Sequence, residues 1–163
     1  VDFRGNQLFH RSESVKVPAN CSHPAFRLQR DRLLQGLDRT DCVLLTELVQ
    51  DEQVIDLSTY YFEKCKNLAL QAAQISVNVR VRNNAFCFDI RTDTLVKNLY
   101  LHLPGNGHNF SDNFFDLVPG YPKSVTLPVD QGAPESSENV LQRLECLSVY
   151  DTYNLGALKV VKA

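Results

Sequence analysis

One stretch decides how this chain folds, and it reads Phe110-Ser111-Asp112-Asn113-Phe114-Phe115-Asp116-Leu117-Val118-Pro119-Gly120-Tyr121-Pro122-Lys123-Ser124-Val125-Thr126-Leu127. A polar step leads into an aromatic and aliphatic run, which Pro-Gly-Tyr-Pro interrupts before a strand-like Ser-Val-Thr-Leu. Pro119 fixes φ near the value required at the second position of a turn, and Gly120 accepts the positive φ of the third. The stretch predicts two short strands joined by a tight turn, with the side chains of residues 114–117 in a core.

The surrounding sequence is rich in strand patterns. Residues 74–82 alternate apolar and polar side chains, Asn83-Asn84 favours a hairpin turn, and residues 85–90 pair back with Phe86, Phe88 and Ile90 on one face. Further strands are expected at 7–10, 14–17, 25–29, 42–49, 54–62, 95–103 and 140–150, a helical turn or two within 30–39, and a polar loop at 131–139. Short strands separated by Pro, Gly and Asn turns predict an antiparallel sandwich.

The strand count suggests two unequal parts. About seven strands follow residue 71, which is the number in one immunoglobulin-like domain, whereas only about five precede residue 62. We therefore predict an all-β chain: an immunoglobulin-like antiparallel β-sandwich preceded by part of a second one. The expected divisions are a partial domain at 1–64, a C-terminal domain at 65–155 and a basic tail at 156–163.

Charge and composition exclude several partners. The net charge is −2 and the pI is about 6.1, so the chain carries no basic footprint for nucleic acid or anionic membranes. No apolar run approaches the length that crosses a bilayer. We expect neither a nucleic-acid nor a membrane partner. The sequence opens in mid-pattern and contains no Met, so we interpret it as a piece of a longer protein.

Neither the cysteines nor the histidines form a recognisable site. The five cysteines lack Cys-x-x-Cys spacing, and several lie on apolar runs typical of buried positions. His102 and His108 flank a Gly-rich turn near Asp112, but a metal set is less probable than surface histidines. We therefore assign no metal and no cofactor. The compartment stays open; secreted, periplasmic or lysosomal sites are favoured over the cytoplasm.

The motif Ser-Asp-Asn-Phe-Phe-Asp-Leu-x-Pro-Gly-x-x-x-x-Val at 111–125 resembles the C-terminal immunoglobulin-like domain of β-mannosidases of glycoside hydrolase family 2, and residues 144–153 resemble the way those enzymes end. The similarity runs from about Val15 to Tyr153. It implies that residues 1–62 are the latter part of the preceding domain, with its first strands missing. It also implies a parent enzyme that removes terminal β-D-mannose with retention, through a glycosyl intermediate on one Glu while another acts as acid and base.

The resemblance places both glutamates on a (β/α)8 barrel, and this chain has no alternating βα pattern. Asp112 and Asp116 are no substitute, because strand positions four apart lie about 13 Å apart, beyond the separation a glycosidase uses. No catalytic residue is assigned and the chain alone is not expected to be an enzyme. The resemblance implies a non-catalytic accessory region whose partner is the catalytic barrel, with a mannose-containing oligosaccharide as a further candidate.

Aromatic side chains are the remaining candidates for contact with a sugar or another domain: Phe110, Phe114, Phe115 and Tyr121, with a second cluster at residues 60–62. Neighbours on a strand point to opposite faces, so Phe114 or Phe115 faces outward or toward another domain. Core or interdomain packing is favoured over sugar contact. The alternative hypotheses are a stand-alone carbohydrate-binding module and a fibronectin-like interaction module.

Overall fold

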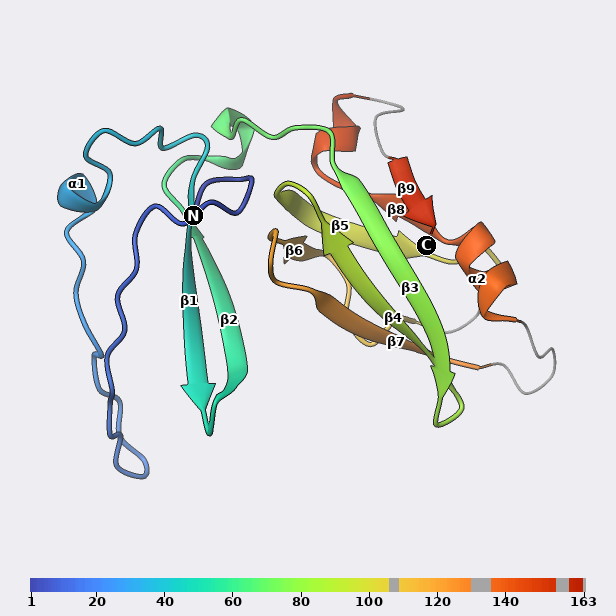
Figure 1. Cartoon of the computed structure of the whole chain (residues 1–163), viewed down its shortest axis with the longest axis horizontal. Coiled ribbons are helices and arrows are strands. Elements are labelled where there is room, and N and C mark those ends of the chain that lie inside the picture. Colours follow the sequence, from blue (N-terminus) through green and yellow to red (C-terminus); the bar gives the residue numbers. More distant parts are fainter. Residues whose placement is uncertain (106–108, 130–135, 155–158, 163) are drawn as a thin grey trace. The chain divides into compact units, whose positions relative to one another are not determined.

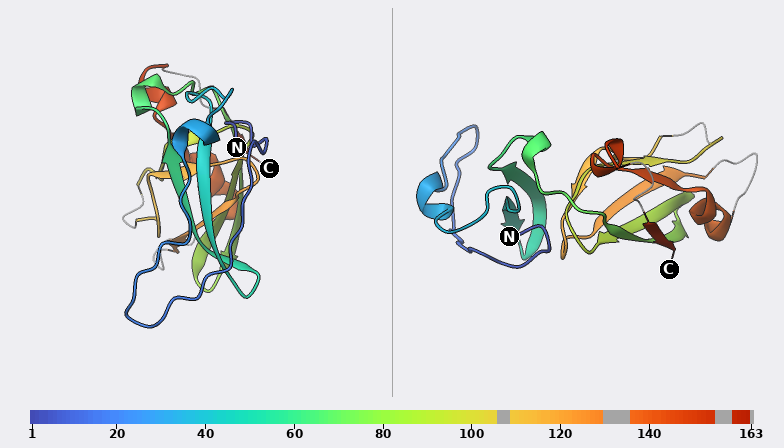
Figure 2. Two further views of the ribbon diagram at one scale, coloured as in Figure 1. Left: turned by 90° about the vertical axis from the view of Figure 1, so that its left-hand side faces the viewer. Right: turned by 90° about the horizontal axis from the view of Figure 1, so that it is seen from above.

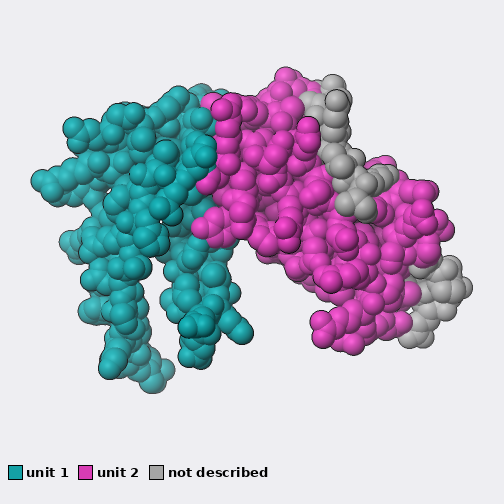
Figure 3. Space-filling view, viewed as in Figure 1, with its two compact units in different colours: residues 1–2, 6–68 teal, residues 3–5, 69–163 magenta. Residues whose placement is uncertain are grey.

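The computed structural model describes residues 1–105, 109–129, 136–154 and 159–162. Contacts divide the chain into two compact units, coloured separately in Figure 3: residues 1–2 and 6–68 form unit 1, and residues 3–5 and 69–163 form unit 2. No helix of the described residues is long and apolar enough to span a membrane.

Unit 2 is a two-layered sandwich (Figures 1 and 2). One sheet has the order β7-β4-β3-β9 and the other the order β6-β5-β8. The bounds are β3 Gln74–Arg82, β4 Ala85–Thr92, β5 Val96–His102, β6 Phe115–Leu117, β7 Lys123–Pro128, β8 Glu145–Leu147 and β9 Lys159–Lys162. Every described pair is antiparallel except β3 with β9. The predicted all-β antiparallel sandwich is confirmed.

The core lies between these sheets. Side chains alternate between the two faces of β3 and β4. Those of Ile75, Val77, Phe88 and Ile90 point inward and have no measurable exposure, as the sequence pattern predicts. They belong to one cluster with Leu99, Leu101 and Leu117 of the facing sheet. Leu127 of β7 joins the cluster from their own sheet. Asn83 and Asn84 have φ of +49° and +58°, which gives the predicted tight turn between β3 and β4.

Unit 1 is built on one hairpin. Strands β1 (Val43–Gln50) and β2 (Gln53–Tyr61) pair antiparallel, as predicted, and form a two-stranded sheet. Asp51 and Glu52 take φ of +49° and +64° at its turn; Asp is common at the first of these positions, whereas Glu52 stands where Gly is usual. Within the described part of the chain, no third strand joins this sheet.

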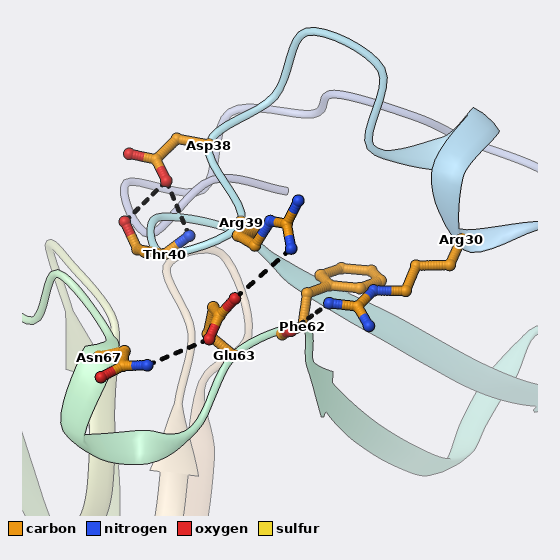
Figure 4. A network of polar contacts seen from close by, with 7 residues as sticks. All are labelled: Arg30, Asp38, Arg39, Thr40, Phe62, Glu63 and Asn67. Carbon is orange, nitrogen blue, oxygen red and sulfur yellow. Dashed lines mark hydrogen bonds and ion pairs between the residues drawn. The ribbon is translucent and has the colours of Figure 1, made fainter.

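A polar network connects the segment before the hairpin to the segment after it (Figure 4). Glu63 forms an ion pair with Arg39 at 3.7 Å and accepts a hydrogen bond from Asn67 Nδ2 at 3.2 Å. Arg30 begins the one-turn helix α1 (Arg30–Leu33), and its guanidinium donates to the Phe62 carbonyl at 2.9 Å. Asn67 closes the short 3-10 helix η1 (Cys65–Asn67). The helical turn predicted within 30–39 is thus present.

Three expected strands do not form. Residues 7–10, 14–17 and 25–29 have no strand pairing and are mostly exposed. Their alternating or β-branched residues satisfy the local pattern, but a strand needs a paired neighbour for its backbone N–H and C=O groups. The strand propensity of these residues was therefore not sufficient to predict a strand.

The closing segment also differs from the prediction. Residues 137–143 form helix α2 (Ser137–Arg143) instead of the start of a strand, and only Glu145–Leu147 of the expected 140–150 strand is extended. Ser136 explains the helix start, because its side chain accepts a hydrogen bond from Asn139 N at 3.2 Å. A second 3-10 helix, η2 (Tyr150–Thr152), follows. The expected tail contains β9, which pairs with β3.

Candidate functional site

The stretch from Phe110 onward crosses from one sheet of unit 2 to the other. Its first residues lie beside β7, because Ser111 N donates to Thr126 O at 2.8 Å and Thr126 N donates to Ser111 Oγ at 2.9 Å. Its next residues form β6, which pairs with β5. The predicted tight turn follows: Tyr121 N donates to Val118 O at 3.0 Å and Gly120 has φ of +86°.

Asn113 anchors the entry to β6. Its Oδ1 accepts from Leu101 N and its Nδ2 donates to Leu101 O, both at 2.8 Å. The side-chain amide therefore satisfies both backbone groups of a β5 residue, as a neighbouring strand would. Asn113 Oδ1 also accepts from Phe114 N at 3.1 Å. No sequence pattern distinguishes this asparagine from an ordinary turn residue.

The two carboxylates of the stretch are held by different lysines. Asp112 lies 2.5 Å from Lys123 Nζ, and this hydrogen bond lowers the pKa of its carboxyl group. Asp116 lies 2.9 Å from Lys97 Nζ and accepts from Asn98 N at 2.9 Å. Each carboxylate is bound to its own cation, which fits a structural role better than a shared catalytic one.

Three of the four predicted contact aromatics pack within the unit. Phe110 stands edge-to-face on buried Phe88, with ring centres 5.2 Å apart. Phe115 packs against the core cluster, with Lys123 Nζ 5.2 Å from its ring centre. Tyr121 is half-buried and bridges to Val118 in the turn.

Phe114 is the outward-facing member of the pair. Its side chain is 64% exposed, so the expectation that it lies in the core is wrong. Its ring stacks on Tyr100 at 4.9 Å between centres and 23° between planes. Tyr100 lies on β5 between buried Leu99 and Leu101, so the alternation of that strand was a usable signal for its outward position.

The histidine hypothesis gains no support from the described residues. His102 stacks on Tyr100 with ring centres 6.1 Å apart, and His108 lies outside the described residues. Among the described residues, no cluster of three or more His, Cys, Asp or Glu is arranged to hold a metal ion.

A second candidate is an open hollow of about 430 Å³ on the β3–β4 sheet, lined mostly by polar residues: Ser76, Val77, Asn78, Arg80, Asp89 and Arg91. The Asp89 carboxylate accepts from Ser124 Oγ at 2.7 Å and forms an ion pair with Arg80. The hydrogen bond from Ser124 lowers the pKa of Asp89, with Arg80 adding to the effect against partial burial. An antiparallel sheet that packs on a core with one face usually has polar residues on its other, solvent-exposed face. The polar residues around the hollow are therefore accounted for without a ligand.

Comparison with known proteins gives matches to both halves of the chain. The family described as a mannosidase Ig/CBM-like domain matches residues 1–67, and the mannosidase family described as an Ig-fold domain matches residues 70–152. A β-mannosidase of Mus musculus is 26% identical over 147 residues, which cover 87% of this chain and 16% of the mouse protein. A β-mannosidase of Capra hircus is 28% identical over 120 residues, covering 72% of this chain and 13% of its own length.

The fold comparison agrees. The crystal structure of a β-D-mannosidase from Dictyoglomus thermophilum superposes with a TM-score of 0.72 and 21% identity, over 98% of this chain and 18% of that one. The chain thus spans less than a fifth of each of these relatives. It belongs to the family of mannosidase immunoglobulin-like domains.

Proposed function

We propose that this chain is the non-catalytic, C-terminal accessory region of a β-mannosidase-like glycoside hydrolase. The observation that carries the proposal is the match of its two halves, in order, to two consecutive mannosidase domain families. The parent enzyme would hydrolyse terminal β-D-mannose residues with retention of configuration. This chain would support the catalytic barrel.

The hairpin of unit 1 supports the need for such a partner. Leu48, Val49, Val54 and Ile55 each expose more than half of their surface. A two-stranded hairpin is only marginally stable in water, and unpaired strand edges readily recruit further strands. Apolar side chains on an incomplete sheet are accounted for if another segment of the parent protein completes it.

The carboxylates of the Phe110–Leu127 stretch support a non-catalytic role. Asp112 and Asp116 are each bound by a lysine from a neighbouring segment. Retaining hydrolysis requires one carboxyl group as nucleophile and a second as acid and base on the same sugar. The proposal places that pair elsewhere in the parent enzyme.

An activity assay tests the assignment. The purified 163-residue chain and the full-length product of its gene are compared on p-nitrophenyl β-D-mannopyranoside. We expect turnover by the full-length protein and none by the chain. Turnover by the pure chain, or a full-length product inactive on β-mannosides, would contradict the proposal.

Hydrogen exchange tests the structural part. The amides of β1 and β2 are followed in the isolated chain and in the full-length protein. They should exchange rapidly in the chain and become protected in the longer protein, while β3 and β4 serve as an internal reference that changes little. Equal protection in both proteins would show that nothing outside the chain completes the hairpin.

A further inference from the structure

A row of three rings lies on the outer face of the β6-β5-β8 sheet. Phe114 stacks on Tyr100, and Tyr100 stacks on His102 with 9° between ring planes. Tyr100 and His102 are two apart on β5, so both project from the same face while Leu99, Leu101 and Leu103 point into the core. The ring centres of Phe114 and Tyr100 are 4.9 Å apart, and those of Tyr100 and His102 are 6.1 Å apart. The row is therefore about as long as a short oligosaccharide.

The end of the row is held rigidly. Phe114 has φ of +59°, a conformation that costs a non-glycine residue free energy and persists only where the surroundings impose it. Asn113 imposes it here, because its side chain bonds both Leu101 N and Leu101 O and also receives Phe114 N. The ring is thereby presented to solvent in one orientation before any ligand arrives, which lowers the entropic cost of binding.

Strand β8 supplies the border of the row. Leu147 is the register partner of Tyr100, and Glu145 is the register partner of His102. Leu147 is 53% exposed, and both His102 and Glu145 are exposed. Along β5 and β8, the Tyr100 ring and the Leu147 side chain therefore neighbour a carboxylate and an imidazole, whereas Phe114 lies on the opposite, β6 side of β5. Small-ligand sites combine apolar surface with a few polar groups, and this open face has the same composition without the usual cleft.

The size of the apolar surface argues against a protein partner. An aromatic side chain buries at most about 250 Å². A specific protein interface buries about 800 Å² on each partner, of which slightly more than half is apolar. The exposed parts of Phe114 and Leu147 together fall far short of that requirement. A ligand that needs only one ring face and a few hydrogen bonds fits this surface better.

We propose that this ring row is a binding platform for a short mannose-containing oligosaccharide, with one pyranose stacked through its C–H face on Phe114. Further units of the oligosaccharide extend along the row past Tyr100, where a hydroxyl group donates to the Glu145 carboxylate and another hydrogen-bonds to His102. The ligand class follows from the ring geometry; the choice of mannose rests on the proposed function.

The test is an NMR titration of the 163-residue chain with β-1,4-mannotriose, following backbone amide resonances. The resonances of residues 100, 102 and 114 should shift saturably. Phe114→Gly should weaken binding by about tenfold, the loss expected when one aromatic contact is removed. Tyr60→Ala removes a similarly exposed aromatic ring from unit 1 and is the matched control, which should leave binding unchanged.

Phe114→Asn is the second variant, because asparagine also tolerates positive φ; the dispersion of the spectra reports whether both variants fold. Absence of saturable shifts up to the solubility limit of the sugar would overturn the proposal, as would equal binding by the folded variants. The proposal would also be overturned if another domain of the full-length protein covered the outer face of the β6-β5-β8 sheet. These outcomes leave the mannosidase assignment untouched, because that assignment is tested by turnover.

Discussion

Phe114 combines a positive φ of +59° with a ring that is 64% exposed. Glycine at this position would keep the left-handed conformation and remove its steric cost, which is about 1–2 kcal/mol for a residue with a side chain. It would also remove the stack on Tyr100, which is worth about 0.5–1.5 kcal/mol. The two effects have opposite signs and similar sizes. The ring is therefore not needed for stability, which is consistent with a role in binding.

We predict that Phe114→Gly changes the free energy of unfolding by less than about 1 kcal/mol. Asn113→Ala should instead destabilise by about 1–3 kcal/mol, because Leu101 N and Leu101 O lose their partner. Urea unfolding followed by tyrosine fluorescence measures both variants. A larger loss for Phe114→Gly than for Asn113→Ala would show that the ring is primarily structural.

Asp89 gives the pH prediction. Its pKa is lowered in the folded chain, first by the hydrogen bond from Ser124 and then by Arg80. Because the folded pKa lies below the unfolded value of about 3.9, the carboxylate contributes stability that is complete above that value. This contribution is lost as the pH falls through the folded pKa, so it makes stability depend on pH only at the acid end of the profile.

Ser124→Ala should raise the pKa of Asp89 toward its ordinary value and reduce the acid-dependent loss of stability. Thr126→Ala is the matched control, since Thr126 is exposed on the same strand and its hydroxyl is not among the groups that lower this pKa. A carboxyl-carbon NMR titration reads the pKa directly. An unchanged Asp89 titration in Ser124→Ala would contradict the assignment of the cause.

At the scale of elements, the turn at residues 3–5 lies against the turn of the Phe110–Leu127 stretch. Phe3 is 1% exposed, and its carbonyl accepts from Leu95 N at 2.7 Å and from Thr94 Oγ1 at 3.1 Å. Gly5 has φ of +85°, and a Cβ added to it would lie 2.8 Å from Pro119 Cβ. The close approach, as well as the conformation, therefore requires glycine.

Gly5→Ala and Gly120→Ala separate these two requirements. Gly120 has φ of +86°, but nothing lies within 4 Å of an added Cβ. In both variants the free energy of unfolding should fall by about 1–2 kcal/mol, because alanine is strained in the left-handed conformation. Only Gly5→Ala should fall further, because its Cβ would collide with Pro119. Thermal unfolding of the two proteins measures the difference. Equal losses would show that Pro119 moves aside without cost.

At the scale of the whole molecule, the two units differ in how much they bury. Among the described residues of unit 1, the buried apolar side chains are Cys42, Val43 and Leu68, whereas unit 2 contains the core cluster. Segments with few buried apolar contacts open at low free energy, and proteases cleave them first.

Limited trypsin digestion should therefore cleave first within residues 27–39, which contain Arg27, Arg30, Arg32 and Arg39. A resistant product that begins after this segment and includes unit 2 should accumulate, and mass spectrometry identifies it. Early cleavage within β3 or β4, or similar resistance of both units, would contradict this difference in stability.

The sequence by itself determined the features that depend on near neighbours. Strict alternation predicted β3 and β4 with their buried faces, paired asparagines predicted their turn, and Pro119-Gly120 predicted the turn after β6. The two strands of the unit 1 hairpin were also predicted. Period and turn chemistry are local, and here the tertiary environment agreed with them. The motif at 111–125 was specific enough to indicate the family.

Only the tertiary structure decided which side chain plays which part. Phe114 and Phe115 are adjacent and identical, yet the bond between Asn113 and Leu101 turns one ring outward and leaves the other against the core. Residues 7–29 have strand-like patterns but lack a neighbour to pair with, whereas Lys159–Lys162 become a strand because β3 offers a free edge. These outcomes depend on partners distant in the sequence, and a local pattern carries no information about them.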